Sequence, residues 1–360
     1  MRKINKAVYN GGLDFWKLIF TFVIVIYHYA EISKTVSLFK SGSIAVEFFF
    51  ILSGYFMAIS AERKPFTEKL GTDTAQFIWR KIKSILPYYL IGWLIAAILN
   101  MQHWLMEPRT LGEIVLRISN MLPNFLLLSV SGMPEEVVLG VTWYISAMLL
   151  AMAVIYPLLR KYKNIYLRII APLSAILLTG YLSQKYGGFF LSYEFDGFVP
   201  QNIIRACVGI NIGCVVYVAA EKMKTIDFTI FSRILLGLVE IGGYIWILVA
   251  MTIFPKTYVF TELFIFLAVV TITASKKGIF SSLFDNNIVM VVSSISLPLF
   301  LLHPTCRAVI RREKWPTDWD LFYKYLIAAV ASALACMIVV WLFGKIKEKV
   351  GKRARKIFIK

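Results

Sequence analysis

The feature that most constrains this chain is a series of long apolar runs separated by short charged loops. A helix needs about 20 mainly apolar residues to cross the hydrocarbon core of a bilayer, and runs of that length recur along the sequence. Only 17% of the residues are charged while 59% are hydrophobic, so the chain has too few charges to cover a soluble core. The mean hydropathy of +0.70 agrees. The sequence therefore predicts an all-α, polytopic membrane helix bundle.

Ten runs have the length and composition of a transmembrane helix. Their approximate limits are 14–33, 43–60, 84–103, 141–159, 167–184, 200–220, 232–254, 258–275, 286–305 and 323–344. The stretch 118–134 is also free of charge, but it holds two prolines and a Ser-Gly pair, so we interpret it as re-entrant or interfacial. We predict a single transmembrane domain over residues 1–344 and a basic amphipathic cytoplasmic tail over residues 345–360.

The distribution of basic residues predicts the orientation of the bundle. With ten helices, 26 of the 39 Lys and Arg residues fall on the side of the two termini and 11 on the opposite side. Loops rich in Lys and Arg stay in the cytoplasm, so both termini are predicted to be cytoplasmic. One outer loop departs from this rule, and either it has a binding role or the topology differs there. Its basic residues are Arg307, Arg311, Arg312, Lys314 and Lys324.

The formal net charge of +18 does not indicate a nucleic-acid partner, because the basic residues lie between apolar runs, as in cytoplasmic loops. The four cysteines form no CxxC pair, and no His lies at metal-ligand spacing from any of them. We therefore expect neither a disulfide framework nor a metal site. The chain is predicted to be a multi-pass protein of the cell membrane, with the lipid bilayer as its surroundings.

Ionisable residues within a span are costly and tend to face a cavity or each other, so they mark candidate sites. The first run holds Asp14 and Lys17, which can pair on adjacent turns, and His28, eleven residues beyond Lys17. In an α-helix, eleven residues place the two side chains within roughly 20° of the same face and about 16 Å apart along the axis. Both residues also have explanations that involve no function. Lys17 can extend to the lipid headgroups, and His28 can be a buried neutral histidine that is hydrogen-bonded to a neighbouring helix.

Other charged residues lie near the ends of later runs. Glu47 sits at the outer entrance of the second run, where it can orient His28 or pair with another cation. Arg205 is a candidate partner of Glu47 or of a sugar, or a snorkelling arginine. In the second run, Ser53 and Gly54 permit close contact with a neighbouring helix. His303 precedes a proline at the end of a run, a position that favours a structural role.

A basic stretch, Arg80, Lys81 and Lys83, leads into the third run. Such a cluster is either ordinary cytoplasmic charge or a phosphate-binding patch. The sequence alone leaves these two readings open.

Five sequence blocks occur in an order that points to a known family. They are the basic residue eleven positions before a His, VEFFFILSGYF, the basic stretch running into ILP, WYISAMLL from Trp143, and SISLPLFLLHP with His303. This ordered set, from about Leu13 to His303, resembles the acyltransferase-3 family of membrane acyltransferases. The resemblance implies about ten spans and transfer of acyl groups, commonly acetyl, from cytoplasmic acyl-CoA to hydroxyls of carbohydrates or related envelope molecules.

The resemblance also assigns residues. Lys17 and His28 take the place of the family's basic-residue-and-His motif, and the basic stretch before ILP takes the place of its paired-arginine motif. Ser84 stands where the second arginine is expected, so Lys83 supplies that charge from one position earlier or it is missing. A lysine also lacks the planar fork with which arginine binds a phosphate in bidentate fashion.

Acyl transfer to a hydroxyl needs a base for the hydroxyl proton and a cation or dipole for the developing oxyanion. We predict that His28, the only histidine expected to be buried well within a span, is the general base and that Glu47 is a candidate orienting partner. Lys17 and the basic stretch before ILP are expected to hold the diphosphate and pantetheine end of CoA. The candidate substrate-binding residues are Arg205, Trp143 and His303.

The leading hypothesis is a membrane O-acyltransferase that acts on a cell-envelope or exported polysaccharide or its precursor. The resemblance implies that acyl-CoA, with acetyl as the common acyl group, is the donor substrate, and no bound cofactor is expected. Envelope polysaccharide synthesis machinery is a candidate partner. The alternative is a transporter or flippase of an envelope glycan without acyl chemistry, since intramembrane charges and a basic outer loop also suit a carrier.

Overall fold

The computed structural model describes residues 9–33, 35–106, 110–189, 195–254, 259–310 and 317–358, which are almost entirely helical. In chain order the elements are α1 (Gly11–Ala30), η1 (Gly42–Ile44), α2 (Ala45–Glu62), α3 (Leu70–Leu105), α4 (Leu111–Asn120), α5 (Leu122–Phe125), α6 (Thr142–Lys161), α7 (Lys163–Ile165), η2 (Tyr166–Ile170), α8 (Ala171–Tyr186), β1 (Phe195–Asp196), β2 (Val199–Pro200), α9 (Gln201–Lys224), α10 (Ile230–Ile253), α11 (Val259–Ser275), α12 (Asn287–Ser293), α13 (Ser296–Ile310) and α14 (Asp318–Phe358).

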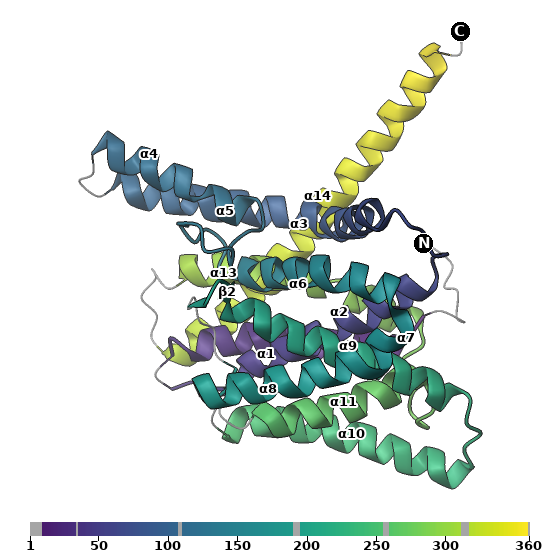
Figure 1. Ribbon diagram of the computed structural model, residues 1–360. Helices are drawn as coiled ribbons and strands as arrows, with labels where there is room; N and C mark the ends of the chain where they lie inside the picture. Colours follow the sequence, from purple (N-terminus) through teal and green to yellow (C-terminus); the bar gives the residue numbers. More distant parts are fainter. Residues whose placement is uncertain are drawn as a thin grey trace.

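Within the described residues, nine helical segments are long and apolar enough to cross a membrane. They contain α1, α2, α3, α6, α8, α9, α10, α12 with α13, and α14. The predicted run 258–275 forms α11, whose apolar part, Phe260–Ser275, is shorter than the other nine. The predicted all-α, multi-pass membrane bundle is therefore confirmed, and Figure 1 shows its helices packed side by side.

Helices α2 and α9 form the centre of the bundle. Helix α9 packs against α2, α6, α8 and α11, while α1 packs against α2, α11, α12 and α13. A Cβ atom on Gly54 of α2 would overlap the carbonyl oxygen of Ile210, and one on Gly213 of α9 would overlap that of Ile51. The two backbones come this close because both positions are glycine. The interpretation of Gly54 as a helix-contact residue is confirmed.

The stretch 118–134 is not a membrane-crossing helix. It contains the end of α4, the four-residue α5 and a series of turns. Helix α4 has no buried residue, and its start is fixed by a capping box between Thr110 and Glu113. Figure 1 shows α4 and α5 beside α3 along one edge of the bundle, while α10 and α11 lie along the opposite edge. This placement agrees with the predicted absence of a full span.

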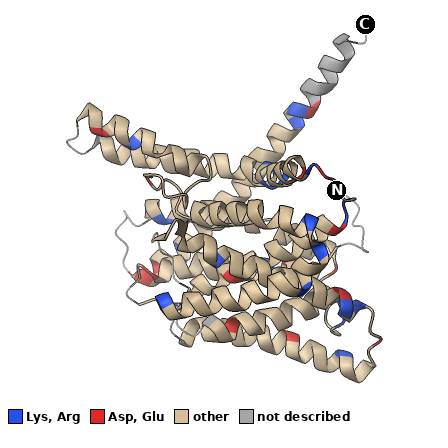
Figure 2. Ribbon diagram, in the orientation of Figure 1, with Lys and Arg blue, Asp and Glu red and all other residues tan. Residues whose placement is uncertain are grey.

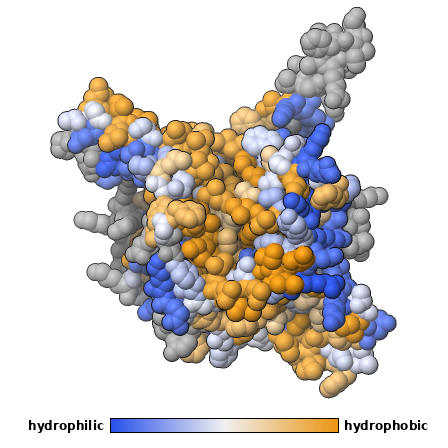
Figure 3. Space-filling view, viewed as in Figure 1, coloured by the Kyte–Doolittle hydropathy of each residue, from blue (hydrophilic) through white to orange (hydrophobic). Residues whose placement is uncertain are grey.

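The bundle has two ends, which carry most of the charge on view (Figure 2). We call the end where α1 and α3 begin the N-terminal end, and the end where α2, α6 and α9 begin the far end. Figure 3 shows hydrophobic residues over much of the middle of one face and hydrophilic residues toward its two sides. That pattern suits a bundle whose middle lies in lipid. The cytoplasmic location of the N-terminal end remains a prediction.

The start of the last helix, α14, is hydrogen-bonded to the end of α1 at the far end of the bundle. Asp318, the first residue of α14, accepts hydrogen bonds from the Tyr29 hydroxyl at 2.9 Å and the Ser33 hydroxyl at 2.5 Å. Its carboxylate also accepts from the backbone and hydroxyl of Thr35. These bonds hold the end of α1 against the start of α14. From there α14 continues without a break through position 345, where we placed the start of the tail, to Phe358.

Candidate active site

A cavity of about 350 Å³ lies toward the far end of the bundle, among α1, η1, α2, α6, α9 and α13. Its wall combines apolar and aromatic side chains with several polar groups. The polar residues and tyrosines that line it are Tyr27, His28, Glu31, Ser43, Tyr144 and Arg205. We call it the His28 cavity. Three residues named from the sequence, His28, Arg205 and Trp143, line it together although they lie on three different helices.

His28 lies in the last turn of α1, and its ring is held by a carboxylate one turn further on. The Nδ1 atom of His28 is 3.2 Å from Oε2 of Glu31. An ionised carboxylate only accepts hydrogen bonds, so Nδ1 carries the proton and Nε2 keeps a lone pair. In this tautomer the imidazole can accept a proton through Nε2.

A cation of α13, Arg307, lies beside His28 and Glu31. Nη1 of Arg307 donates to the carbonyl oxygen of His28 at 3.0 Å and lies 3.9 Å from Oε2 of Glu31. The sequence predicted Arg307 in the basic outer loop that departs from the positive-inside rule, but the structure places it in the last turns of α13. Of the other basic residues of that loop, Arg311, Arg312 and Lys314 lie outside the described residues.

His303 does not line the His28 cavity, but it is the most buried of the three histidines. It is fully buried in α13, and its ring stacks on that of His28 with centroids 5.2 Å apart and planes 25° apart. Nδ1 lies 3.2 Å from the Leu299 carbonyl oxygen, which can only accept, so Nδ1–H is the donor. Nε2 makes no hydrogen bond to any described residue.

Two sequence interpretations of the histidines need correction. His28 is not the only histidine buried well within a span, because its side chain is 26% exposed and His303 is fully buried. His303 also does not end its helix. Helix α13 continues through Pro304 to Ile310, since a proline can be accommodated within a helix when neighbouring groups satisfy the freed backbone.

Glu47 and Arg205 form a buried ion pair beside the cavity. Nε of Arg205 donates to Oε1 of Glu47 at 2.5 Å, with 1% and 0% of the two side chains exposed. Nη2 of Arg205 donates to the Ser43 carbonyl oxygen at 3.1 Å, and the guanidinium lies 5.1 Å from the centre of the Trp143 ring. The predicted alternative in which Glu47 pairs with Arg205 is therefore confirmed. The carboxylate bonded to His28 is Glu31 instead of Glu47.

One atom of each side chain in this ion pair has no hydrogen-bond partner among the described residues. Nη1 of Arg205 and Oε2 of Glu47 are buried and make no hydrogen bond within the described ranges. A buried donor or acceptor without a partner is costly, so such atoms mark places where a ligand or water completes the bonding. Because Arg205 lines the cavity, Nη1 is a donor available to a bound group.

The cations expected to bind CoA lie elsewhere. Nζ of Lys17 pairs with Asp14 at 2.6 Å, as the three-residue spacing predicts, and Lys17 does not line the His28 cavity. On α3, Arg80 and Lys83 are exposed and Lys81 is half-buried. Helix α3 packs against α6, α13 and α14, and α1 also packs against α13. The cations thus form two groups, both toward the N-terminal end.

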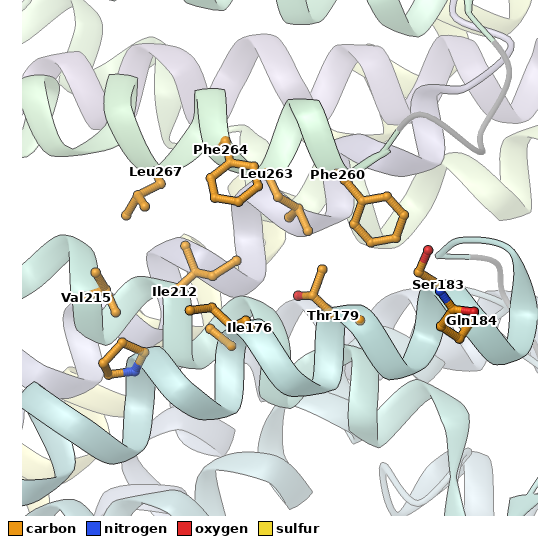
Figure 4. A pocket seen from close by; sticks show the side chains of 13 residues that line it. Ile176, Thr179, Ser183, Gln184, Ile212, Val215, Phe260, Leu263, Phe264 and Leu267 are labelled. Carbon is orange, nitrogen blue, oxygen red and sulfur yellow. The ribbon is translucent and has the colours of Figure 1, made fainter.

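A larger cavity is unsuited to acid–base chemistry. This groove, about 420 Å³, runs between α8 and α11 over α9. Figure 4 shows Phe260, Phe264 and Leu267 facing Ile176 and Thr179 across it. Its lining residues, all in the described ranges, include no acid, lysine, arginine or histidine. The smaller His28 cavity, which is lined by such groups, is therefore the candidate site.

Comparison with known proteins identifies the family. A family model described as an acyltransferase domain matches residues 10–344, nearly the whole chain. The chain belongs to the acyltransferase-3 family. No curated protein and no solved structure matches it. The family supports a membrane acyltransferase over the carrier that we kept as an alternative.

Among the charged residues at this acyltransferase's cavity, sequence reasoning missed the roles of Glu31 and Arg307. Glu31 lies three residues after His28, the same spacing that predicted the Asp14–Lys17 pair, so this rule could have found it. Arg307 carried a weaker signal, its position in a basic loop on the unexpected side of the membrane. The stacking of His303 on His28 depends on the packing of α1 against α13, which no local pattern reveals.

Proposed function

We propose that this acyltransferase moves an acyl group, acetyl in the simplest case, from cytoplasmic acyl-CoA to a hydroxyl of a cell-envelope or exported polysaccharide or its precursor. One observation carries the proposal. The His28 imidazole, bonded through Nδ1 to Glu31, lines a cavity that Arg205 also lines. A base and an unsatisfied cationic donor at one cavity are the two groups that acyl transfer to a hydroxyl requires.

The steps follow from these groups. Nε2 of His28 takes the proton of the acceptor hydroxyl while the hydroxyl oxygen attacks the carbonyl carbon of the thioester. The carbonyl electrons move to the oxygen, and a donor such as Nη1 of Arg205 stabilises the resulting oxyanion. When the intermediate collapses, the C–S bond breaks, the ester remains, and the imidazolium returns its proton to the CoA thiolate. Glu31 stabilises the imidazolium while it exists.

Transfer to oxygen is favoured over transfer to nitrogen by the presence of a base. A neutral hydroxyl is a weak nucleophile and gains most from proton removal, whereas an unprotonated amine attacks a thioester without it. The histidine–carboxylate pair at His28 is therefore best matched to a hydroxyl acceptor.

The donor must reach the cavity from the end that binds its nucleotide. Lys17 and the exposed Arg80 and Lys83 lie toward the N-terminal end, where cations can bind the phosphates of CoA. Lys17 and His28 are eleven residues apart on α1, which corresponds to about 16 Å along the axis. The extended pantetheine arm would have to cover that distance for the thioester to meet His28.

The direct test uses the full-length protein in lipid nanodiscs with radiolabelled acetyl-CoA and a polysaccharide fraction from the cell envelope. We expect label to appear in the polysaccharide together with an equal amount of released CoA thiol, and mild alkali to remove the label because the product is an ester. A protein that leaves acetyl-CoA intact in the presence of the polysaccharide would contradict the proposal. Label that resists mild alkali would contradict O-acylation.

A further inference from the structure

A second pocket at the far end has its own set of polar groups. It has a volume of about 310 Å³ and is formed by the loop between α5 and α6 together with β1 and the start of α9. Glu135, Ser129, Asn202 and Phe195 line it. We call it the Glu135 pocket. Figure 1 shows the loop after α5 and the β strands at the same end of the bundle.

The carboxylate of Glu135 has no hydrogen bond of good geometry within the described ranges, although the Ser129 hydroxyl lies close to it. Both of its oxygens are buried, and neither makes a hydrogen bond to any residue that the structure describes. Burial raises the pKa of Glu135 to about 7, an effect that the nearby Ser129 hydroxyl partly offsets. The neighbouring Glu136 differs, since it pairs with Arg117 at 2.7 Å. A buried carboxylate without donors is costly, and a ligand that supplies donors would remove that cost.

An aromatic ring forms one wall of the pocket. Phe195 is 45% exposed, and its ring lies directly on Gly132, where a Cβ would overlap the ring. Gly132 has φ +85°, a conformation that glycine adopts readily. The pocket thus presents a flat apolar surface together with a carboxylate and the amide of Asn202. Hydroxyl groups match the polar side chains, and the C–H face of a sugar ring matches the phenyl ring.

The Glu135 pocket is adjacent to the His28 cavity along α9. Asn202 lines the first and Arg205 lines the second, three residues and therefore about 4.5 Å further along the helix axis. The loop of the pocket is joined to α6 by a hydrogen bond from the Val130 amide to the Ser146 hydroxyl, at 3.3 Å. A chain of sugar units bound in the pocket would therefore lie beside the cavity in which its neighbour reacts.

We propose that the Glu135 pocket is a subsite for a neutral saccharide unit of the acceptor, in which the Glu135 carboxylate accepts hydrogen bonds from sugar hydroxyls and Phe195 stacks on the ring. The inference rests on the proposed function for its biological meaning. A metal ion fits less well, because Glu135 is the sole acidic residue among the described residues that line the pocket.

The ionisation of Glu135 sets the pH dependence of binding. The titratable or charged groups of the surrounding elements are Glu136 of the same loop with its partner Arg117 of α4, Tyr89 of α3, which interacts electrostatically with Glu135, and, further along α9, Arg205. Sugar hydroxyls bond the ionised carboxylate most strongly, so affinity should rise as pH passes upward through about 7. From pH 6 to pH 8 the ionised fraction rises about tenfold for a group with this pKa.

Calorimetric titration of the full-length protein in nanodiscs with cellobiose and maltose tests the subsite without acetyl-CoA. We expect wild type to bind at least one disaccharide, with a Kd that falls about tenfold from pH 6 to pH 8. Glu135→Gln should raise the Kd at pH 8 about tenfold and remove the pH dependence. The matched control Glu136→Gln should bind as wild type does, because its partner Arg117 lies outside the pocket.

Absence of binding of both disaccharides to wild type overturns the proposal, as does a Glu135→Gln Kd within twofold of wild type. A wild-type Kd that does not change between pH 6 and pH 8 also overturns it, and this arm needs no variant to fold. Because the titration contains no acyl donor, its outcome is separate from that of the acetyl-CoA experiment. Disaccharide binding by a protein that never consumes acetyl-CoA would refute the proposed function and leave the subsite intact.

Discussion

At the scale of residues, the two glutamates near the His28 cavity are expected to differ in role. Glu31 bonds His28, and its side chain is 39% exposed, so it can be changed without leaving a buried charge behind. Glu47 is fully buried against Arg205. Removing one partner of a buried ion pair strands the other charge, whereas removing a partly exposed partner does not. The same chemical change should therefore have different effects at the two positions.

We predict that Glu31→Gln lowers the kcat of acetyl transfer about 10- to 100-fold with little change in thermal stability. The loss should be smaller than for the buried aspartate of a serine protease, because water can partly replace Glu31. Glu47→Gln should instead destabilise the protein by about 3–5 kcal/mol and lower its Tm. Transfer assays and thermal melts of both variants check this. A Glu31→Gln variant with wild-type kcat would refute the orienting role of that carboxylate.

How well single residues could be predicted depends on whether their contacts are local. The Asp14–Lys17 pair follows from a three-residue spacing and was predictable. His28 was found because an ionisable group within a span is unusual. The partner of Glu47 lies 158 positions away on another helix, so the sequence could offer Arg205 as one alternative among several. The complete burial of His303 follows from helix packing and had no local signal.

At the scale of elements, the contact of α2 with α9 holds the cavity wall in place. Glu47 and Arg205 lie on these two helices, and Gly54 and Gly213 allow the backbones to approach. Run lengths and charges predicted where the ten apolar segments lie, because the bilayer fixes how long a span must be. They did not predict that α3 begins 14 residues before its predicted limit, that α14 ends 14 residues after its limit, or that the ninth run is divided into α12 and α13. The pairing of α2 with α9 could not be predicted, since small residues show that a helix packs closely but not with which neighbour.

We predict that Gly54→Ala or Gly213→Ala destabilises the protein by about 1–3 kcal/mol or more, because the added methyl group would meet backbone that cannot move aside. The matched control is Gly180→Ala in α8, where a Cβ meets no atom within 4 Å. There alanine should be neutral or stabilise by up to about 1 kcal/mol. Thermal melts of the three variants in nanodiscs are the measurement. Equal Tm values for Gly54→Ala and Gly180→Ala would argue against tight α2–α9 packing.

At the scale of the whole molecule, the account depends on which end of the bundle faces the cytoplasm. The distribution of basic residues predicts that the N-terminal end is cytoplasmic, where the proposed acyl-CoA donor would meet Lys17 and Arg80. The His28 cavity lies toward the far end, close to an acceptor outside. This arrangement divides donor and acceptor between the two sides of the membrane, and it would be reversed if the orientation were reversed.

We predict that, in a cysteine-free background, Gly140→Cys is labelled by a membrane-impermeant maleimide in intact cells, while Gly71→Cys is labelled only after permeabilisation. Both positions are exposed, and a side chain at either meets open space. Gly140 lies at the far end before α6, and Gly71 at the N-terminal end in the first turn of α3. The opposite labelling pattern would overturn the orientation and the assigned donor side.

The central claim is that the His28 imidazole removes the proton from the acceptor. The most direct measurement is the rate of acetyl transfer by His28→Gln, with His103→Gln, an exposed histidine at the end of α3, as the matched control. The account predicts a loss of about 10²- to 10⁴-fold for His28→Gln, with unchanged Tm, and a wild-type rate for His103→Gln. A folded His28→Gln protein that transfers acetyl groups at the wild-type rate would contradict the account.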